Sequence, residues 1–301
     1  MAYTLTDQDW ATLLDRIQKG KCTPFLGAGV NYGILPTGAE IAANWAREYN
    51  YPLKDVEDLT RVSQFVGIKL DEPIRPKELI LSLFEKALVG CDLDAKLKDR
   101  QNPLGFLAGL PLPVYITTNY DDFMIRALRF AGKNPHLELC GWNRLVTQKY
   151  KSVFKGKGRV NPTKDDPVVF HLHGHKDTAE SLVLTEDDYL DFLVEVSKQQ
   201  EMLPARIQEA VTGSSLLFIG YRLADMNFRV LFRGLINSMP GSLRRISLAV
   251  QLPPGEVSED ERANMQAYLD QYFRKMDVRV YWGNADNFVT ELRERWEQFN
   301  K

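Results

Sequence analysis

Short apolar runs rich in β-branched residues recur along the chain, and segments with helical periodicity separate them. The runs predict strands at residues 24–27, 114–119, 168–174, 215–220, 246–251 and 278–282. Each run is brief and apolar almost throughout, which is typical of strands that are covered on both faces. Strands that alternate with helices favour a parallel sheet. We therefore predict an α/β fold with a Rossmann-like, mostly parallel sheet and helices on both faces.

One section interrupts this alternation. Residues 50–104 show helical patterns and no credible strand, so we expect a small helical layer inserted between the first and second strands. We expect residues 1–301 to form a single domain that carries this insertion. The stretch from 138 to 166 is rich in loop-forming residues, and His136, just before it, also lies in a loop-like segment.

The composition excludes several classes of protein. The formal net charge is -2, so no global positive field attracts nucleic acid or an anionic membrane, and the basic run at 148–159 is expected to be a solvated loop. Cys22, Cys91 and Cys140 form no CxxC pair, which excludes a four-cysteine zinc module. The N-terminal segment lacks the apolar core of a signal peptide, and no run reaches the ~20 apolar residues of a membrane span. We expect a cytoplasmic protein that binds neither nucleic acid nor membrane.

The first candidate site follows the first predicted strand, which runs into Gly27-Ala28-Gly29. Glycine allows a backbone to approach a ligand closely, and amides at the start of the next helix can bind a pyrophosphate. The segment lacks the third glycine of GxGxxG, and it is not GxxxxGK[ST]. A tight turn between a strand and a helix explains it equally well.

Two further strands end in polar or glycine-containing segments. The second predicted strand leads into "TTNYDD", where Asp122 is expected to cap the next helix; capping does not require Asn119, which is the better functional candidate. The fourth leads into "GYRLAD", where Gly220 and Tyr221 could border a nucleotide and Asp225 could cap a helix. A plain turn and cap explain this last segment equally well.

The segment "VVFHLHGHKD", residues 168–177, holds three of the four histidines of the chain. Alternation along a strand places His171 and His173 on one face, and Gly174 is expected to end the strand.

A zinc site in this segment would need further ligands, for which only His136 and a carboxylate such as Asp177 are candidates. A single histidine at the carboxyl end of the strand, acting as a base, fits the sheet geometry better. His171 would then be a packed neighbour and His175 a surface residue.

The order of these motifs resembles the sirtuin-like family, and more closely its zinc-free bacterial branch found in antiviral defence systems. The resemblance rests on "FLGAGV", "ITTNYDDF", "HLHG" and "LLFIGYRLADMNFR", and it runs from about residue 20 to the C-terminus. It implies that the glycine loop contacts NAD, that Asn119 and Asp121 belong to the nicotinamide-ribose pocket, and that His173 is the catalytic histidine. We expect dinucleotide contacts from the glycine loop and its flanking motifs: Gly27, Ala28, Gly29, Val30, Thr118, Gly220, Tyr221 and Asp225.

The resemblance also implies an activity. The zinc-free relatives use water as the acceptor and degrade NAD, so we expect an NAD+ glycohydrolase that takes NAD as its substrate and needs no metal. Such an enzyme would deplete NAD during antiphage defence (abortive infection), held inactive by a homo-oligomer, by a separate regulatory or sensor protein, or by both.

Two alternatives to the glycohydrolase share part of this pattern. A protein deacylase is disfavoured because the zinc module is missing and "GAGVNYGILPTGAE" lacks the Asp-Phe-Arg of those enzymes. A non-catalytic sensor of NAD or ADP-ribose would keep the glycine loop, but it would not need both Asn119 and His173.

Overall fold

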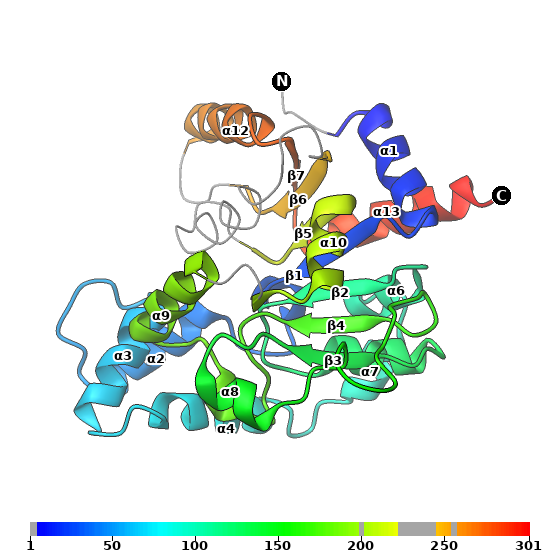
Figure 1. Ribbon diagram of the computed structural model, residues 1–301. Helices are drawn as coiled ribbons and strands as arrows, with labels where there is room; N and C mark the ends of the chain where they lie inside the picture. Colours follow the sequence, from blue (N-terminus) through cyan, green and yellow to red (C-terminus); the bar gives the residue numbers. More distant parts are fainter. Residues whose placement is uncertain (1–4, 199–201, 222–244, 254–257) are drawn as a thin grey trace.

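A seven-stranded sheet lies at the centre of the molecule, in the order β3-β4-β2-β1-β5-β6-β7, with every neighbouring pair parallel (Figure 1). The computed structural model describes residues 5–198, 202–221, 245–253 and 258–301. Asp225 lies outside these residues. The strands are β1 Cys22–Leu26, β2 Val114–Thr117, β3 His136–Leu139, β4 Val168–His171, β5 Ser215–Ile219, β6 Ser247–Gln251 and β7 Val278–Trp282.

The six strands predicted from sequence are confirmed, although β2 and β4 end earlier than expected. The edge strand β3 was not predicted, and the placement of His136 in a loop is wrong because this residue begins β3. The first two residues of β3 are only half-buried, so the strand does not appear as a continuous apolar run.

The strand order creates a switch point at β1. This strand pairs with β2 on one side and with β5 on the other. The chain first places β2, β3 and β4 on one side of β1, with β4 inserted between β2 and β3, and then returns to place β5, β6 and β7 on the opposite side. In open parallel sheets, ligands bind in the crevice outside the carboxyl ends of the strands at such a point.

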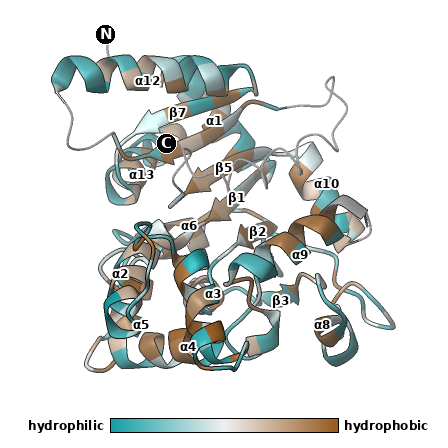
Figure 2. Cartoon of the chain, turned by 90° about the vertical axis from the view of Figure 1, so that its left-hand side faces the viewer, coloured by the Kyte–Doolittle hydropathy of each residue, from teal (hydrophilic) through white to brown (hydrophobic). Residues whose placement is uncertain are grey.

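Helices cover both faces of the sheet, which confirms the predicted fold class. One face packs against α1 Asp7–Gln18, α5 Leu93–Lys98, α6 Pro103–Gly109, α7 Phe123–Phe130 and α13 Ala285–Phe299. The other packs against α9 Glu186–Lys198, α10 Ala205–Gly213 and α12 Glu259–Arg274. Figure 2 shows the apolar β1 and β5 between helices of mixed polarity. Among the described residues, no helix combines the length and apolar character that crossing a membrane requires.

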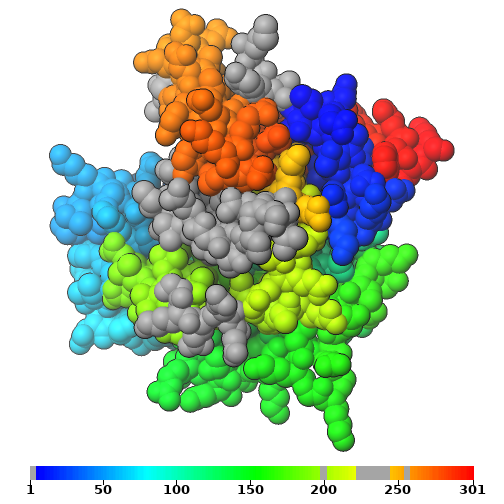
Figure 3. Space-filling model, turned by 45° about the horizontal axis from the view of Figure 1, so that its top comes forward, coloured from blue at the N-terminus to red at the C-terminus, as the bar shows by residue number. Residues whose placement is uncertain are grey.

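A separate helical layer lies to one side of the sheet. It consists of α2 Gly38–Glu48, α3 Leu59–Lys69 and α4 Arg75–Ala87, which share an apolar cluster with Leu182 and Leu184. The last two residues belong to the segment between β4 and α9, so the layer is joined to the sheet through that segment. Figure 3 shows the light-blue surface of this layer beside the yellow-green surface of α9.

Candidate functional site at the carboxyl ends of the strands

The turn after β1 packs directly on the turn after β5. The N–H of Gly27 donates to the Ile219 carbonyl at 2.9 Å, and the N–H of Gly29 donates to the Gly220 carbonyl at 3.0 Å. The structure therefore brings together the two glycine segments that the sequence places almost 200 residues apart, at the switch point of the sheet.

This packing requires glycine on both sides. A Cβ atom on Gly27 would lie 2.7 Å from the Gly220 carbonyl oxygen, and one on Gly29 would lie 2.9 Å from the Gly220 Cα. Gly220 has a φ of +84°, and a Cβ there would lie 2.5 Å from the Val30 nitrogen. Close backbone approach thus accounts for all three glycines within the protein itself.

The residues between these glycines face different surroundings. Ala28 begins the short 3-10 helix η1, Ala28–Asn31, and is exposed. Val30 is 4% exposed, its side chain lies in the core against one face of the sheet, and its N–H donates to the Gly27 carbonyl. A ligand at this turn would therefore meet Ala28 more readily than the side chain of Val30.

The segment after β2 is tied to both turns. The Asn119 side-chain amide donates to the Gly27 carbonyl at 3.1 Å. The Thr118 hydroxyl lies 2.8 Å from the Tyr221 hydroxyl, which donates to the Leu26 carbonyl at 2.8 Å. The expected site residues Thr118, Asn119 and Tyr221 therefore form one connected group at the carboxyl ends of β1, β2 and β5.

Asp121 is buried beneath this group. Its carboxylate accepts a hydrogen bond from the Asn31 amide at 2.6 Å and another from the Phe123 N–H at 2.9 Å. Burial raises the pKa of Asp121 to about 6, although these two donors act in the opposite direction. Asn31 was not predicted as a site residue, although it lies two residues after Gly29. No sequence pattern indicates that a polar side chain at this position is buried.

The expected capping role of Asp122 is wrong. Asp122 occupies the N-cap position of α7, but its side chain makes no cap hydrogen bond. Its carboxylate instead pairs with Lys176 at 2.9 Å, while Asp121 accepts the free N–H of the first turn. The Asp122 carboxylate is therefore held by Lys176 and makes no hydrogen bond to the start of α7.

His171 contacts both the Asn119 backbone and the His175 ring. The Nδ1 of His171 is 3.1 Å from the Asn119 carbonyl oxygen, and its ring contacts the His175 ring edge-on with centroids 4.7 Å apart. His175 is 3% exposed, so its expected place on the surface is wrong. Its segment folds inward because Gly174, at a φ of +92°, turns the chain back onto Ser181, whose hydroxyl accepts the His175 N–H at 2.9 Å.

His173 lies in different surroundings. Because β4 ends at His171, the expected alternation that would place both histidines on one face does not continue. The His173 ring, 4% exposed, makes T-shaped contacts with Tyr189 and Phe192 on α9, with centroids 5.2 and 5.1 Å away. Burial lowers the pKa of both His171 and His173 to about 3, so each ring is neutral near pH 7.

The histidines are not arranged as a metal site in the part of the chain that the structure describes. No three His, Cys, Asp or Glu side chains there are grouped so that they could hold a metal ion. His136 faces Asp166, with Nε2 and Oδ1 4.0 Å apart. His175 lies 3.5 Å from Asp177, between Nδ1 and Oδ2.

The chain is similar to a known domain family and to curated proteins. A family model described as a SIR2-like domain matches residues 113–281. Two curated proteins named NAD(+) hydrolase ThsA, from Enterococcus faecium and Bacillus cereus (strain MSX-D12), are 27% identical over 218 residues and 22% identical over 280 residues. These alignments cover 71% and 91% of this chain, but only 39% and 53% of the two relatives.

A solved structure was also found, with the description "Structural Basis for the Mechanism and Regulation of Sir2 Enzymes". It aligns with 98% of this chain and 99% of its own at 12% identity, with a TM-score of 0.40.

Proposed function

Because the chain belongs to the SIR2-like domain family, as its motifs predicted, we propose that it is an NAD+ glycohydrolase that cleaves the bond between nicotinamide and ribose. One observation carries the proposal: the Asn119 amide reaches the Gly27 carbonyl. This contact joins the glycine turn to the polar segment after β2. The names of the relatives, NAD(+) hydrolase ThsA, support the same activity.

The chemistry needs few groups. Water attacks C1′ of the nicotinamide ribose while the bond from C1′ to the pyridinium nitrogen breaks, and its electron pair leaves with neutral nicotinamide. The products are nicotinamide, ADP-ribose and a proton. Because the transition state has oxocarbenium character, anionic and dipolar groups near the ribose lower its energy.

Each proposed catalytic residue has a role in this step. Asn119 would position the water or the ribose hydroxyls. His173 would accept a proton at Nε2, which has no hydrogen-bond partner among the described residues. Asp121, held by Asn31, would orient the nicotinamide end of the substrate or offset developing charge. The mechanism requires no metal.

The dinucleotide would lie along the turns after β1 and β5. We propose contacts from Gly27, Ala28, Gly29, Val30, Thr118, Gly220 and Tyr221, and from Asp225 outside the described residues. The glycines have no side chain and the Val30 side chain is buried in the core, so these four residues would contact the dinucleotide through their backbone atoms.

The biological setting is also part of the proposal. We propose that residues 1–301 form one catalytic domain in a cytoplasmic NAD-depleting protein of antiphage defence, held inactive by self-association or by a regulatory partner. The chain spans about half or less of the length of the curated relatives it matches, at 39% and 53%. The control of activity in any larger assembly is therefore a separate question from the chemistry of this domain.

Two observations favour a second candidate, a sensor that binds NAD or ADP-ribose without cleaving it. His173 is 4% exposed, and Asn119 and Asp121 already have partners within the protein. Side chains in such surroundings can serve the fold alone.

Chromatography of the products after incubation with NAD separates the two candidates. The hydrolase should release equal amounts of nicotinamide and ADP-ribose. Binding of NAD measured by calorimetry, with intact NAD recovered under every condition tested, would instead support the sensor.

A further inference from the structure

We propose that Tyr189 is a positioning residue for His173, and that the Lys77–Asp188 ion pair fixes the start of α9 so that Tyr189 can act. The inference rests on the proposed function, because it gives His173 the role of a base. Sequence reasoning singled out neither Tyr189 nor Lys77.

The contact between the two rings carries the first step. The Tyr189 hydroxyl lies 3.5 Å from Nδ1 of His173, a long hydrogen bond, and the rings meet edge-on at an interplanar angle of 79°. Phe192, one turn further along α9, makes a second edge contact at 80°. The imidazole is therefore confined by two aromatic side chains of one helix.

The hydrogen bond at Nδ1 decides what Nε2 can do. A neutral imidazole carries one proton, so a ring that donates from Nδ1 to the Tyr189 oxygen keeps a lone pair on Nε2. Among the described residues, Nε2 of His173 has no hydrogen-bond partner, so its lone pair is not already used. In the proposed arrangement the Tyr189 oxygen accepts from Nδ1, and this direction of the hydrogen bond selects the tautomer that a base requires.

The backbone carbonyl of His173 is also held by this segment. The Val183 N–H donates to the His173 carbonyl at 3.0 Å, and the Tyr120 hydroxyl donates to the Val183 carbonyl at 2.7 Å. A change in the position of residues 183–189 would therefore move both the backbone and the ring contact of His173.

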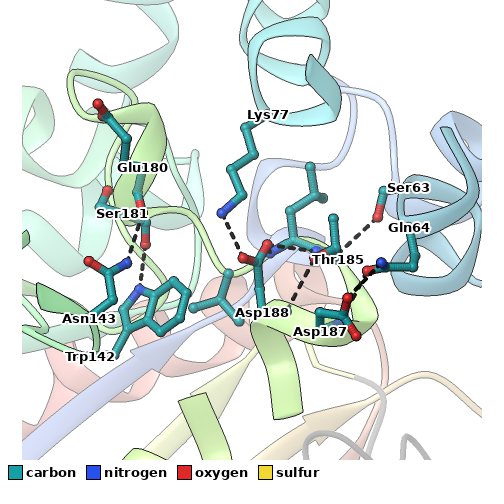
Figure 4. A network of polar contacts seen from close by, with 12 residues as sticks. Ser63, Gln64, Lys77, Trp142, Asn143, Glu180, Ser181, Thr185, Asp187 and Asp188 are labelled. Carbon is teal, nitrogen blue, oxygen red and sulfur yellow. Dashed lines mark hydrogen bonds and ion pairs between the residues drawn. The ribbon is translucent and has the colours of Figure 1, made fainter. Parts of the chain in front are cut away.

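The helical layer holds that segment in place, as Figure 4 shows. Asp188 accepts the N–H groups of Leu184 and Thr185 with one carboxylate oxygen, at 3.1 and 3.0 Å, and pairs with Lys77 of α4 through the other at 2.7 Å. The Lys77 and Asp188 side chains are 8% and 14% exposed. The ion pair is thus largely removed from water, immediately before Tyr189 in the chain.

Two contacts from α3 add to this anchor. The Ser63 hydroxyl donates to the Leu184 carbonyl at 3.1 Å, and the Gln64 amide donates to Asp187 at 2.8 Å (Figure 4). Contacts from α3 and α4 therefore hold the start of α9, and these contacts fix the position of Tyr189.

The first test compares two substitutions that remove a tyrosine hydroxyl. Tyr189→Phe keeps the ring and loses the hydroxyl that faces His173. Tyr115→Phe is the matched control, because the buried Tyr115 hydroxyl donates to the Leu107 carbonyl at 2.9 Å, in the core on the opposite face of the sheet from Phe192.

We expect kcat for NAD hydrolysis to fall about tenfold or more in Tyr189→Phe, with KM within about twofold of wild type. Tyr115→Phe should lower the melting temperature and leave kcat unchanged. An unchanged kcat in Tyr189→Phe, or equal losses in both variants, overturns the inference.

A second measurement does not depend on activity. Nitrogen-15 NMR of histidine-labelled protein reports the tautomer of each ring, and His173→Gln assigns the His173 signals. We expect a proton on Nδ1 in the wild type and a shift toward Nε2 in Tyr189→Phe and in Lys77→Met. If the protein fails to cleave NAD but the tautomer responds in this way, the proposed function fails and the positioning role stands. If NAD is cleaved but the tautomer is unchanged in both variants, the positioning role fails.

Discussion

The side-chain amide of Asn31 donates a hydrogen bond to the Asp121 carboxylate across 2.6 Å, and both residues are buried. The contact joins two segments that lie 90 residues apart in the chain, the 3-10 turn after β1 and the polar segment after β2. It links the glycine loop to a carboxylate that burial makes harder to ionise.

The raised pKa of Asp121 predicts how stability changes with pH. The folded protein holds this proton up to about pH 6, whereas the ordinary carboxyl loses it near 3.8. The stability that protonation contributes is therefore present below about pH 4 and is lost as the pH rises through about 6. Relative to Asp121→Asn, the wild type should lose about 2–3 kcal/mol of unfolding free energy across this range.

Urea unfolding of both proteins at a series of pH values measures the difference. Asn31→Leu provides a second comparison, because it removes a hydrogen bond that lowers the pKa of Asp121 and should extend the loss to higher pH. Parallel pH profiles for wild type and Asp121→Asn would contradict the prediction.

The second prediction concerns the ion pair between the helical layer and α9. Lys77→Met leaves the Asp188 carboxylate largely buried without its counter-charge, and we expect a loss of about 3 kcal/mol or more in unfolding free energy. Lys149→Met is the matched control. Lys149 pairs with Glu180 at a similar distance of 2.6 Å, but the Lys149 side chain is 58% exposed. That variant should lose less than about 1 kcal/mol. Equal losses would show that burial does not decide the strength of the pair.

The third prediction separates backbone conformation from close packing at the two turns. Gly33 has a φ of +77°, and apart from Gly33 and its two chain neighbours no atom of the described residues lies within 4 Å of the place that a Cβ would take there. Gly33→Ala should therefore cost only about 1–2 kcal/mol, from its conformation. Gly220 has a similar φ, but a Cβ there would also lie 2.5 Å from the Val30 nitrogen. Gly220→Ala should lower the melting temperature considerably more than Gly33→Ala. Similar shifts for the two variants would argue against the close contact between the turns.

The sheet could be predicted from sequence because its strands are apolar almost throughout. Runs such as 215–220 and 278–282 are visible without knowledge of their neighbours, and helical segments between them imply parallel pairing. The strand β3 escaped prediction because an edge strand of four residues with a half-exposed start produces no such run.

The site was predicted less completely than the sheet. Motif order placed Asn119 and the glycine turns at one edge, because the carboxyl ends of parallel strands meet there. The inward fold of His175 depends on the conformation of Gly174, and the role of Tyr189 depends on how α9 packs on the segment after β4. Contacts of this kind depend on the tertiary structure, so local sequence patterns do not predict them.

The most direct test of the proposed site is NAD consumption by the purified protein beside Asn119→Ala and His173→Ala, with His136→Ala as the control histidine variant on the edge strand. We expect the wild type and His136→Ala to convert NAD to nicotinamide and ADP-ribose. Asn119→Ala and His173→Ala should each lose about 100-fold or more of this activity while remaining folded. Cleavage of NAD at the wild-type rate by either of those two variants would contradict the proposed site.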